Sequence, residues 1–123
     1  MKSDYSIEIK DDYLCVSVSG KYNFQDFKSY TSMVHEKCEQ EKIFKVLFDA
    51  TNVAGINVPA LEKYYLGVEV AQILQYKIKL AVVWHKDFIN RFFENVAVNR
   101  GGNVCVSDST QKSLDWLFTE SKK

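Results

Sequence analysis

The chain has 123 residues, and its 16 Lys and Arg side chains balance 16 Asp and Glu side chains, so that its formal net charge is zero. This length fits a single domain over residues 1–123, and 46% hydrophobic residues allow it to bury a core. A chain with no net charge has no long-range field that would concentrate it on nucleic acid or on an anionic membrane, so we expect it to bind neither.

The first predicted elements are a β-hairpin and a helix. Apolar and polar residues alternate over 5–9 and over 14–18, and the connection at 10–13 supplies turn residues. After Gly20, Asn23 is a suitable N-cap for a helix over about 24–41. Its inward face comprises Phe24, Phe27, Thr31, Val34 and Cys38.

The middle of the chain predicts a strand over 44–50, a polar loop, a second helix and a strand over 78–84. The helix begins near Pro59, because proline in a first helical turn loses no hydrogen bond, and it ends near Gln75. It carries two apolar stripes. The first comprises Leu61, Tyr64, Tyr65, Val68, Ala71 and Leu74, and the second comprises Leu66, Val70 and Ile73.

The last third predicts a helix, a short strand over 103–106 and a final helix. Asp87 is the expected cap of the third helix, and Arg100-Gly101-Gly102 is a C-terminal stop. The apolar residues of this helix are Phe88, Ile89, Phe92, Phe93, Val96 and Ala97. Ser107, Asp108 or Ser109 caps the final helix, whose inward residues are Leu114, Leu117 and Phe118.

The order β-β-α-β-α-β-α-β-α predicts the α/β class, with a leading hairpin and then parallel strands in the sequential order 1-2-3-4-5. Right-handed crossovers then place the crossover helices mainly on one face of the sheet. One set of alternating strand residues is wholly apolar and the other is mixed, so we expect the second face to be largely open. Its apolar strip comprises Leu47, Ala81, Val83 and Cys105, and this face is a candidate interface.

Neither the cysteines nor the hydropathy pattern indicates a metal site or a membrane protein. Cys15, Cys38 and Cys105 lie far apart and form no C-x-x-C pair, so we expect reduced thiols. No apolar segment approaches the ~20 residues that span a bilayer, and the polar start MKSDYSIEIK has no leader pattern. We expect a cytoplasmic protein with no cofactor.

A leading hairpin followed by successive βα units resembles the STAS family of sulfate transporter and anti-sigma factor antagonist domains. The segments KIKLAVVWHKDF and FFENVAVNRGGNVCVSDSTQKSLDWL are similar to the SpoIIAA-like branch, which ends with a strand, a capped turn and a helix. The resemblance implies a non-catalytic bacterial regulatory or protein-interaction module. It also implies a protein partner or self-association through the loop after the third strand and the helix that follows.

In anti-sigma factor antagonists, the loop after the third strand carries a serine that a partner kinase phosphorylates. The resemblance places Asn57, Val58, Pro59 and Ala60 at the matching positions, and none of them has a hydroxyl group. Thr51 is an alternative acceptor, although a threonine that bonds the loop backbone is the favoured interpretation. The partner-binding residues predicted from this region are Asp49, Thr51, Asn52, Asn57, Leu66, Val70 and Ile73.

A small-molecule or lipid carrier or sensor is the alternative function. Polar groups meet at the carboxyl ends of parallel strands, where ligands usually bind, and aromatic side chains of the second and third helices are suited to line a cavity for an apolar ligand. The predicted ligand-binding residues are Tyr64, Tyr65, His85, Lys86 and Phe92. His85 beside Asp49 or Asp108 is the best acid–base pair, but no motif fixes its geometry, so we expect no enzyme activity.

Overall fold

The computed structural model describes residues 3–54, 58–85 and 91–119. Five strands form one sheet in the order β1-β2-β3-β4-β5, in which β1 and β2 are antiparallel and all later neighbours are parallel. This confirms the predicted α/β fold and strand order. The strands are β1 (Ser3–Ile9), β2 (Leu14–Lys21), β3 (Lys45–Ala54), β4 (Lys79–Val83) and β5 (Asn103–Ser107). The helices are α1 (Phe24–Glu41), α2 (Ala60–Leu74), α3 (Phe92–Asn99) and α4 (Thr110–Leu117).

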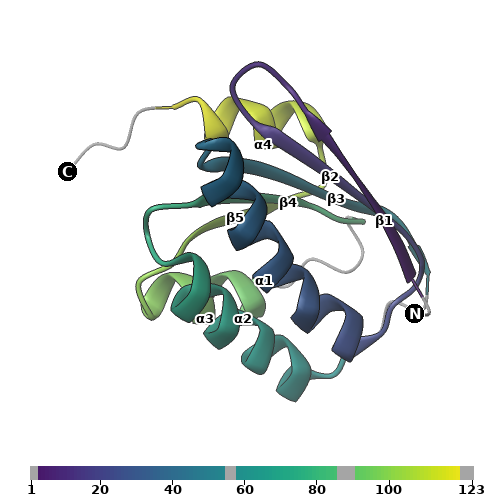
Figure 1. The fold of residues 1–123 in the computed structure, drawn as a ribbon. Coiled ribbons are helices and arrows are strands. Elements are labelled where there is room, and N and C mark those ends of the chain that lie inside the picture. Colours follow the sequence, from purple (N-terminus) through teal and green to yellow (C-terminus); the bar gives the residue numbers. More distant parts are fainter. Residues whose placement is uncertain (1–2, 55–57, 86–90, 120–123) are drawn as a thin grey trace.

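The main core lies between the sheet and the three crossover helices, which cover one face together (Figure 1). Alternate residues of β2 and β3 point into it, among them Leu14, Val16 and Val46, which are at most 1% exposed. Phe27 and Val34 of α1 pack against them, as the apolar spacing of that helix predicts. Burial of this strand face against helices is the main stabilising contribution to the fold.

The opposite face of the sheet is less open than the sequence predicts, because α4 covers it over β3, β4 and β5 (Figure 1). Leu117 of α4 is fully buried against Leu47, Ala81 and Val83, which form a second, smaller core. The expected exposed strip is therefore an interior surface over these strands. Only the β1–β2 side of this face, with exposed Ser6, remains uncovered by a described helix.

Lys79 holds the end of α4 on this second face. Its ammonium donates hydrogen bonds to the carbonyl oxygens of Trp116 (2.6 Å), Leu117 (3.2 Å) and Thr119 (2.8 Å). Carbonyls at the end of a helix have no partner within the helix, so a strand lysine satisfies them. The same ammonium lies 4.6 Å from the centre of the Trp116 ring. Burial lowers the pKa of Lys79.

The edge strand β1 is anchored by a buried polar cluster that the sequence did not indicate. Asp26, in the first turn of α1, accepts hydrogen bonds from the Ser3 amide (3.0 Å) and the Ser3 hydroxyl (2.9 Å). The Ser3 and Tyr30 hydroxyls share a further bond of 2.5 Å. All three residues are buried, so these bonds tie the outer strand to the helix layer.

The third helix begins at Phe92 within the described part of the chain, and the expected cap Asp87, with Phe88 and Ile89, lies outside the described residues. The predicted stop at its other end is confirmed. Gly101 adopts the left-handed backbone conformation at φ 97°, and the Gly102 amide donates to the Ala97 carbonyl (2.8 Å). None of the helices in the described ranges is long and apolar enough to cross a membrane.

Gly67 lets α2 and α3 approach closely. A β-carbon at this position would lie 2.8 Å from Val96 Cγ1 and 3.1 Å from the Phe93 carbonyl oxygen. Gly67→Ala is therefore expected to destabilise the protein by about 1–3 kcal/mol, although alanine is normally the better helix former. Urea denaturation checks this, with the exposed Gln72→Ala on the same helix as the control. A Gly67→Ala protein that gains stability would contradict this close packing.

Candidate functional site

Asp49 lies within β3, as predicted, and Thr51 and Asn52 also lie within this strand and not in the predicted loop, because β3 continues to Ala54. The register with β2 shifts between Ser17 and Ser19, so β3 contains a bulge here. The Asp49 carboxylate accepts hydrogen bonds from the Thr51 amide (3.0 Å) and hydroxyl (2.7 Å), and thus holds the bulged backbone. The Thr51 hydroxyl is bonded to a side chain, where the sequence predicted a backbone partner.

The second apolar stripe of α2 faces inward, which corrects its assignment as a docking surface. Leu66 and Val70 are only 8% and 5% exposed and belong to the main core. Ile73 is partly buried and packs against the same core. The physical reason is that α1 and α3 both contact α2, so this face meets neighbours and not solvent. Leu66 and Val70 are therefore unavailable for direct contact with a partner.

The exposed face of α2 instead carries residues of the first stripe. Leu61 is 63% exposed and Tyr65 is 51% exposed, and their spacing of four places both on one side of the helix. The Tyr64 and Tyr65 rings pack edge to face at 5.6 Å. Arg100 donates a hydrogen bond to the Tyr64 hydroxyl (2.8 Å) and lies over its ring. We call Leu61, Tyr64, Tyr65 and Arg100 the α2 outer face.

A cavity of about 110 Å³ lies between the helix layer and the sheet. Its wall is mostly apolar and comes from three helices and three strands. The aliphatic and phenylalanine lining comprises Phe27, Val34, Phe48, Val58, Leu66, Val70, Leu74, Leu80, Val82, Phe93 and Val106. Tyr22, which follows β2, and Trp84, which follows β4, also line the cavity, so it reaches the edge of the sheet where the parallel strands end. This is the usual position of ligand sites in such sheets.

This cavity differs from the predicted ligand site in most of its residues. Tyr64 and Tyr65 do not line it, and Phe92, 39% exposed, and His85 lie at the surface. Phe93 does line the cavity, as the aromatic pattern predicted. Asn57 and Lys86, like Phe88, lie outside the described residues. The cavity is therefore lined by aromatic residues other than the predicted ones, with the exception of Phe93.

Hydrogen bonds occupy most of the polar groups in the cavity wall. The Tyr22 hydroxyl donates to Glu62 (2.8 Å), and the Tyr30 hydroxyl bonds Ser3. Burial is the main cause that raises the pKa of both tyrosines, so both phenols stay protonated at neutral pH. Glu94 accepts from the Val106 amide (2.6 Å) and from Arg91 (2.9 Å). These groups shape the wall and have little free bonding capacity.

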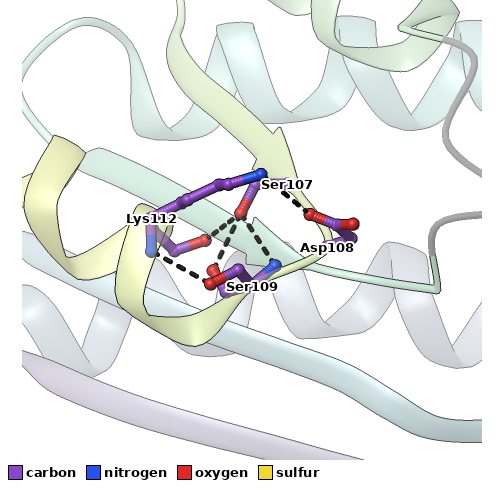
Figure 2. A network of polar contacts seen from close by, with 5 residues as sticks. Ser107, Asp108, Ser109 and Lys112 are labelled. Carbon is purple, nitrogen blue, oxygen red and sulfur yellow. Dashed lines mark hydrogen bonds and ion pairs between the residues drawn. The ribbon is translucent and has the colours of Figure 1, made fainter.

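The polar residues at the end of β5 form a helix cap (Figure 2). Ser109 is the N-cap of α4, and its hydroxyl accepts from the Lys112 amide (3.2 Å). The Ser107 hydroxyl donates to the Ser109 carbonyl (2.9 Å), and Asp108 pairs with the Lys112 ammonium (3.5 Å). The structure thus selects Ser109 among the three predicted caps. These contacts account for the cluster as a local structural feature.

Among the described residues the three cysteines are not activated, and no cluster suited to a metal ion occurs. Burial raises the pKa of Cys15 and Cys105, and it raises that of Cys38 to about 12, so none is an activated thiolate. The Asp49 carboxylate accepts from Thr51, and Asp108 pairs with Lys112. No group of three or more potential metal ligands occurs in the described ranges.

Comparison with known proteins shows what this fold is similar to. No family model matches the chain, and no curated protein matches it significantly. Among solved structures, an anti-sigma factor antagonist from Mycobacterium paratuberculosis superposes with a TM-score of 0.64 at 13% identity, covering 94% of this chain and 93% of that one. A protein with a SpoIIAA-like fold from Shewanella loihica gives 0.55 at 20% identity, with coverage of 94% and 93%.

The anti-sigma factor antagonist SpoIIAA in its unphosphorylated form also superposes, with a TM-score of 0.53 at 6% identity, covering 92% of this chain and 95% of that one. Each match extends over nearly the whole of both chains. At such low identities the likeness concerns the fold. The chain therefore has the SpoIIAA-like fold, which confirms the resemblance drawn from the sequence at the level of structure.

Proposed function

We propose that this protein is a non-catalytic regulatory module of the STAS type, which binds a protein partner through the α2 outer face. Two structural neighbours are anti-sigma factor antagonists, proteins whose name implies action on another protein. The observation that carries the proposal is the exposure of Leu61 and Tyr65 beside Tyr64 and Arg100. Tyrosine and arginine dominate the energetic centres of protein interfaces, so this surface suits a partner better than the buried stripe does.

The proposed module lacks a phosphorylation switch at the start of α2. Positions 57–60 read Asn-Val-Pro-Ala, without a hydroxyl side chain. Thr51 stands earlier in β3, and its hydroxyl donates to Asp49. Partner binding would then be regulated by something other than phosphorylation at this position. Phosphopeptide mapping of the protein purified from its native cells should accordingly find no phosphate on Thr51, the alternative acceptor in this region.

The partner-binding proposal is tested by two tyrosines of equal exposure. Tyr65 is 51% exposed on the α2 outer face, and Tyr76 is 52% exposed beyond the end of α2. Tyr65→Glu should weaken the captured complex about 10-fold or more, because it places a charge in an apolar interface, while Tyr76→Glu should bind normally. Affinity capture from native lysate measures this, and light scattering first establishes whether the partner is a second copy. Equal loss from both variants would contradict the assignment.

A carrier or sensor of a small apolar molecule is a second candidate function. The cavity favours it, because protein interiors are normally packed without voids larger than a water molecule. Leu66 and Val70 contribute to the cavity wall from the inner side of α2. The two functions are compatible, since they use opposite sides of the same helix.

A further inference from the structure

The two edges of the sheet differ in how well they are protected (Figure 1). β5, at one edge, has only five residues, and the Glu94 carboxylate accepts a hydrogen bond from its Val106 amide (2.6 Å). β1, at the other edge, has seven residues and pairs with β2 in an unbroken register, without a bulge or a proline. Long and regular edge strands readily pair with another chain, so β1 is the edge suited to a further strand.

The hydrogen bonds of the hairpin show which backbone groups of β1 face outward. The Lys10 amide donates to the Tyr13 carbonyl (2.9 Å), so these two residues form a hydrogen-bonded pair. Such pairs alternate along an antiparallel ladder, and the Ser3 amide accordingly points away from β2 and donates to Asp26. Three further residues direct their N–H and C=O groups outward, and no hydrogen bond reaches these groups within 3–54, 58–85 and 91–119. They are Tyr5, Ile7 and Ile9, and we call their backbone groups the open edge.

The side chains of β1 separate into an apolar face and a polar face. Tyr5, Ile7 and Ile9 lie on the face toward α1, and the first and last of them are exposed. The Tyr5 ring packs edge to face on Tyr30 of α1, with ring centres 5.3 Å apart. The opposite face carries the exposed polar residues of the strand, which are Asp4, Ser6 and Glu8. A partner strand must therefore match an apolar row on one face and a fixed order of charges on the other.

A second copy of β1 meets both requirements when it lies antiparallel and the two Ile7 residues stand opposite each other. Each Tyr5 then faces Ile9 of the second copy, so the apolar rows meet. On the other face, Asp4 stands opposite Lys10 of the second copy, and this contact of opposite charges occurs twice by symmetry. The backbone groups of the open edge come together in hydrogen-bonded pairs in this register.

The neighbouring registers are less favourable. A pair centred on Ser6 places Asp4 opposite Glu8, and a pair centred on Glu8 places two like carboxylates opposite each other. Like charges directly across a strand pair are destabilising. A pair centred on Tyr5 needs the Ser3 amide, whose hydrogen bond is already made within the chain. Charge and hydrogen bonding thus select one register.

We propose that two copies of this chain dimerise through β1, antiparallel and centred on Ile7, and join their sheets into one continuous sheet. The two copies are related by a two-fold axis at that residue. A single pair of strands is a small interface, so the dissociation constant should lie at about 1–100 µM. This dimer goes beyond the proposed function, because it uses a surface different from the α2 outer face.

Hydrogen exchange at single-residue resolution tests which groups pair, at about 10 µM and about 500 µM protein. The amides of Tyr5, Ile7 and Ile9 should exchange several-fold more slowly in the concentrated sample. Those of Ser6 and Glu8 already face β2, so their exchange should change much less. Sedimentation velocity measures the dimer fraction in the same samples.

Charge-swapped variants test the register. Asp4→Lys and Lys10→Asp each place like charges opposite each other twice, so each should weaken the dimer about 10-fold or more. The double variant restores opposite charges and should recover most of the affinity. Asp115→Lys makes the same change of charge on the exposed side of α4 and is the control, with dimerisation expected to be normal.

Three results would overturn the inference. The first is a protein that stays monomeric at the higher concentration, with equal exchange of the open-edge amides in both samples. The second is a double variant that dimerises no better than the single variants. The third is a dimer that Asp4→Lys leaves intact and Tyr65→Glu abolishes, which would place self-association on the α2 outer face and leave the proposed function standing.

Discussion

Replacement of Leu117 by alanine should destabilise the protein by about 2–5 kcal/mol, the range for removing a fully buried leucine. Leu117 is 0% exposed and is the residue of α4 at the centre of the second core. Its loss leaves a cavity above Leu47, Ala81 and Val83 that the sheet cannot collapse to fill. Urea denaturation at neutral pH measures the change as a lower midpoint.

Phe118→Ala is the control for Leu117→Ala. Phe118 adjoins Leu117 but is 45% exposed, and its ring contacts Tyr13 and Lys45. Phe118→Ala should lower the free energy of unfolding clearly less than Leu117→Ala does. Cys15 packs against the second core. Its thiol should therefore be alkylated faster in the Leu117→Ala variant than in the unaltered protein. Equal costs for the two variants would show that α4 does not seal this face.

The second large effect is expected at Asp26. Asp26→Ala removes the acceptor of two hydrogen bonds from Ser3 and leaves buried donors unpaired, so it should cost about 2–4 kcal/mol. The N-cap of α1 is unaffected, because Asn23 bonds the backbone amide of residue 26 and not its side chain. The backbone amides of β1 should show the largest increase in hydrogen-exchange rate of any strand. Urea denaturation of the same variant measures its overall loss of stability.

Asp26→Asn separates the loss of charge from the loss of the acceptor. The amide oxygen still accepts from Ser3, so this variant should retain part of the stability that Asp26→Ala loses. Ser3→Ala should reproduce only the loss of the hydroxyl contacts, because the Ser3 backbone amide still bonds Asp26. An Asp26→Ala protein as stable as the unaltered chain would contradict a role for this cluster in holding β1.

The sequence was sufficient for the order and pairing of the elements, because period-two strands and crossover helices leave few topologies open. It was not sufficient for the extent of β3. Thr51 and Asn52 are polar and predict the start of a loop, whereas the Asp49 carboxylate supports a bulge that lets the strand continue. A contact between side chain and backbone two residues apart leaves no periodic signal.

The local sequence pattern also could not predict which side of α2 faces the core. Both stripes are apolar, and only the packing of α1 and α3 decides that Leu66 is buried and Leu61 is exposed. Gly67 gave the best local clue, because a glycine inside a helix often marks a close approach to a neighbour, here Val96.

The cavity depends on unfilled space between layers, which no spacing of residues encodes. Its walls combine side chains from α1, α2, α3 and the sheet, so its location follows from the whole arrangement. Trp84 was the missed signal, because an aromatic residue directly after a buried strand lies at the edge where ligands usually bind, and here it lines the cavity.

The most direct test of the proposed regulatory function is photo-crosslinking from the α2 outer face. A photoreactive phenylalanine analogue placed at position 65 in native cells should yield a crosslinked complex with one regulatory protein, identified by mass spectrometry. The same analogue at position 76, equally exposed in the unaltered protein, should yield none of it. A complex that forms from position 76 as readily as from position 65, or from neither, would contradict partner binding through this face.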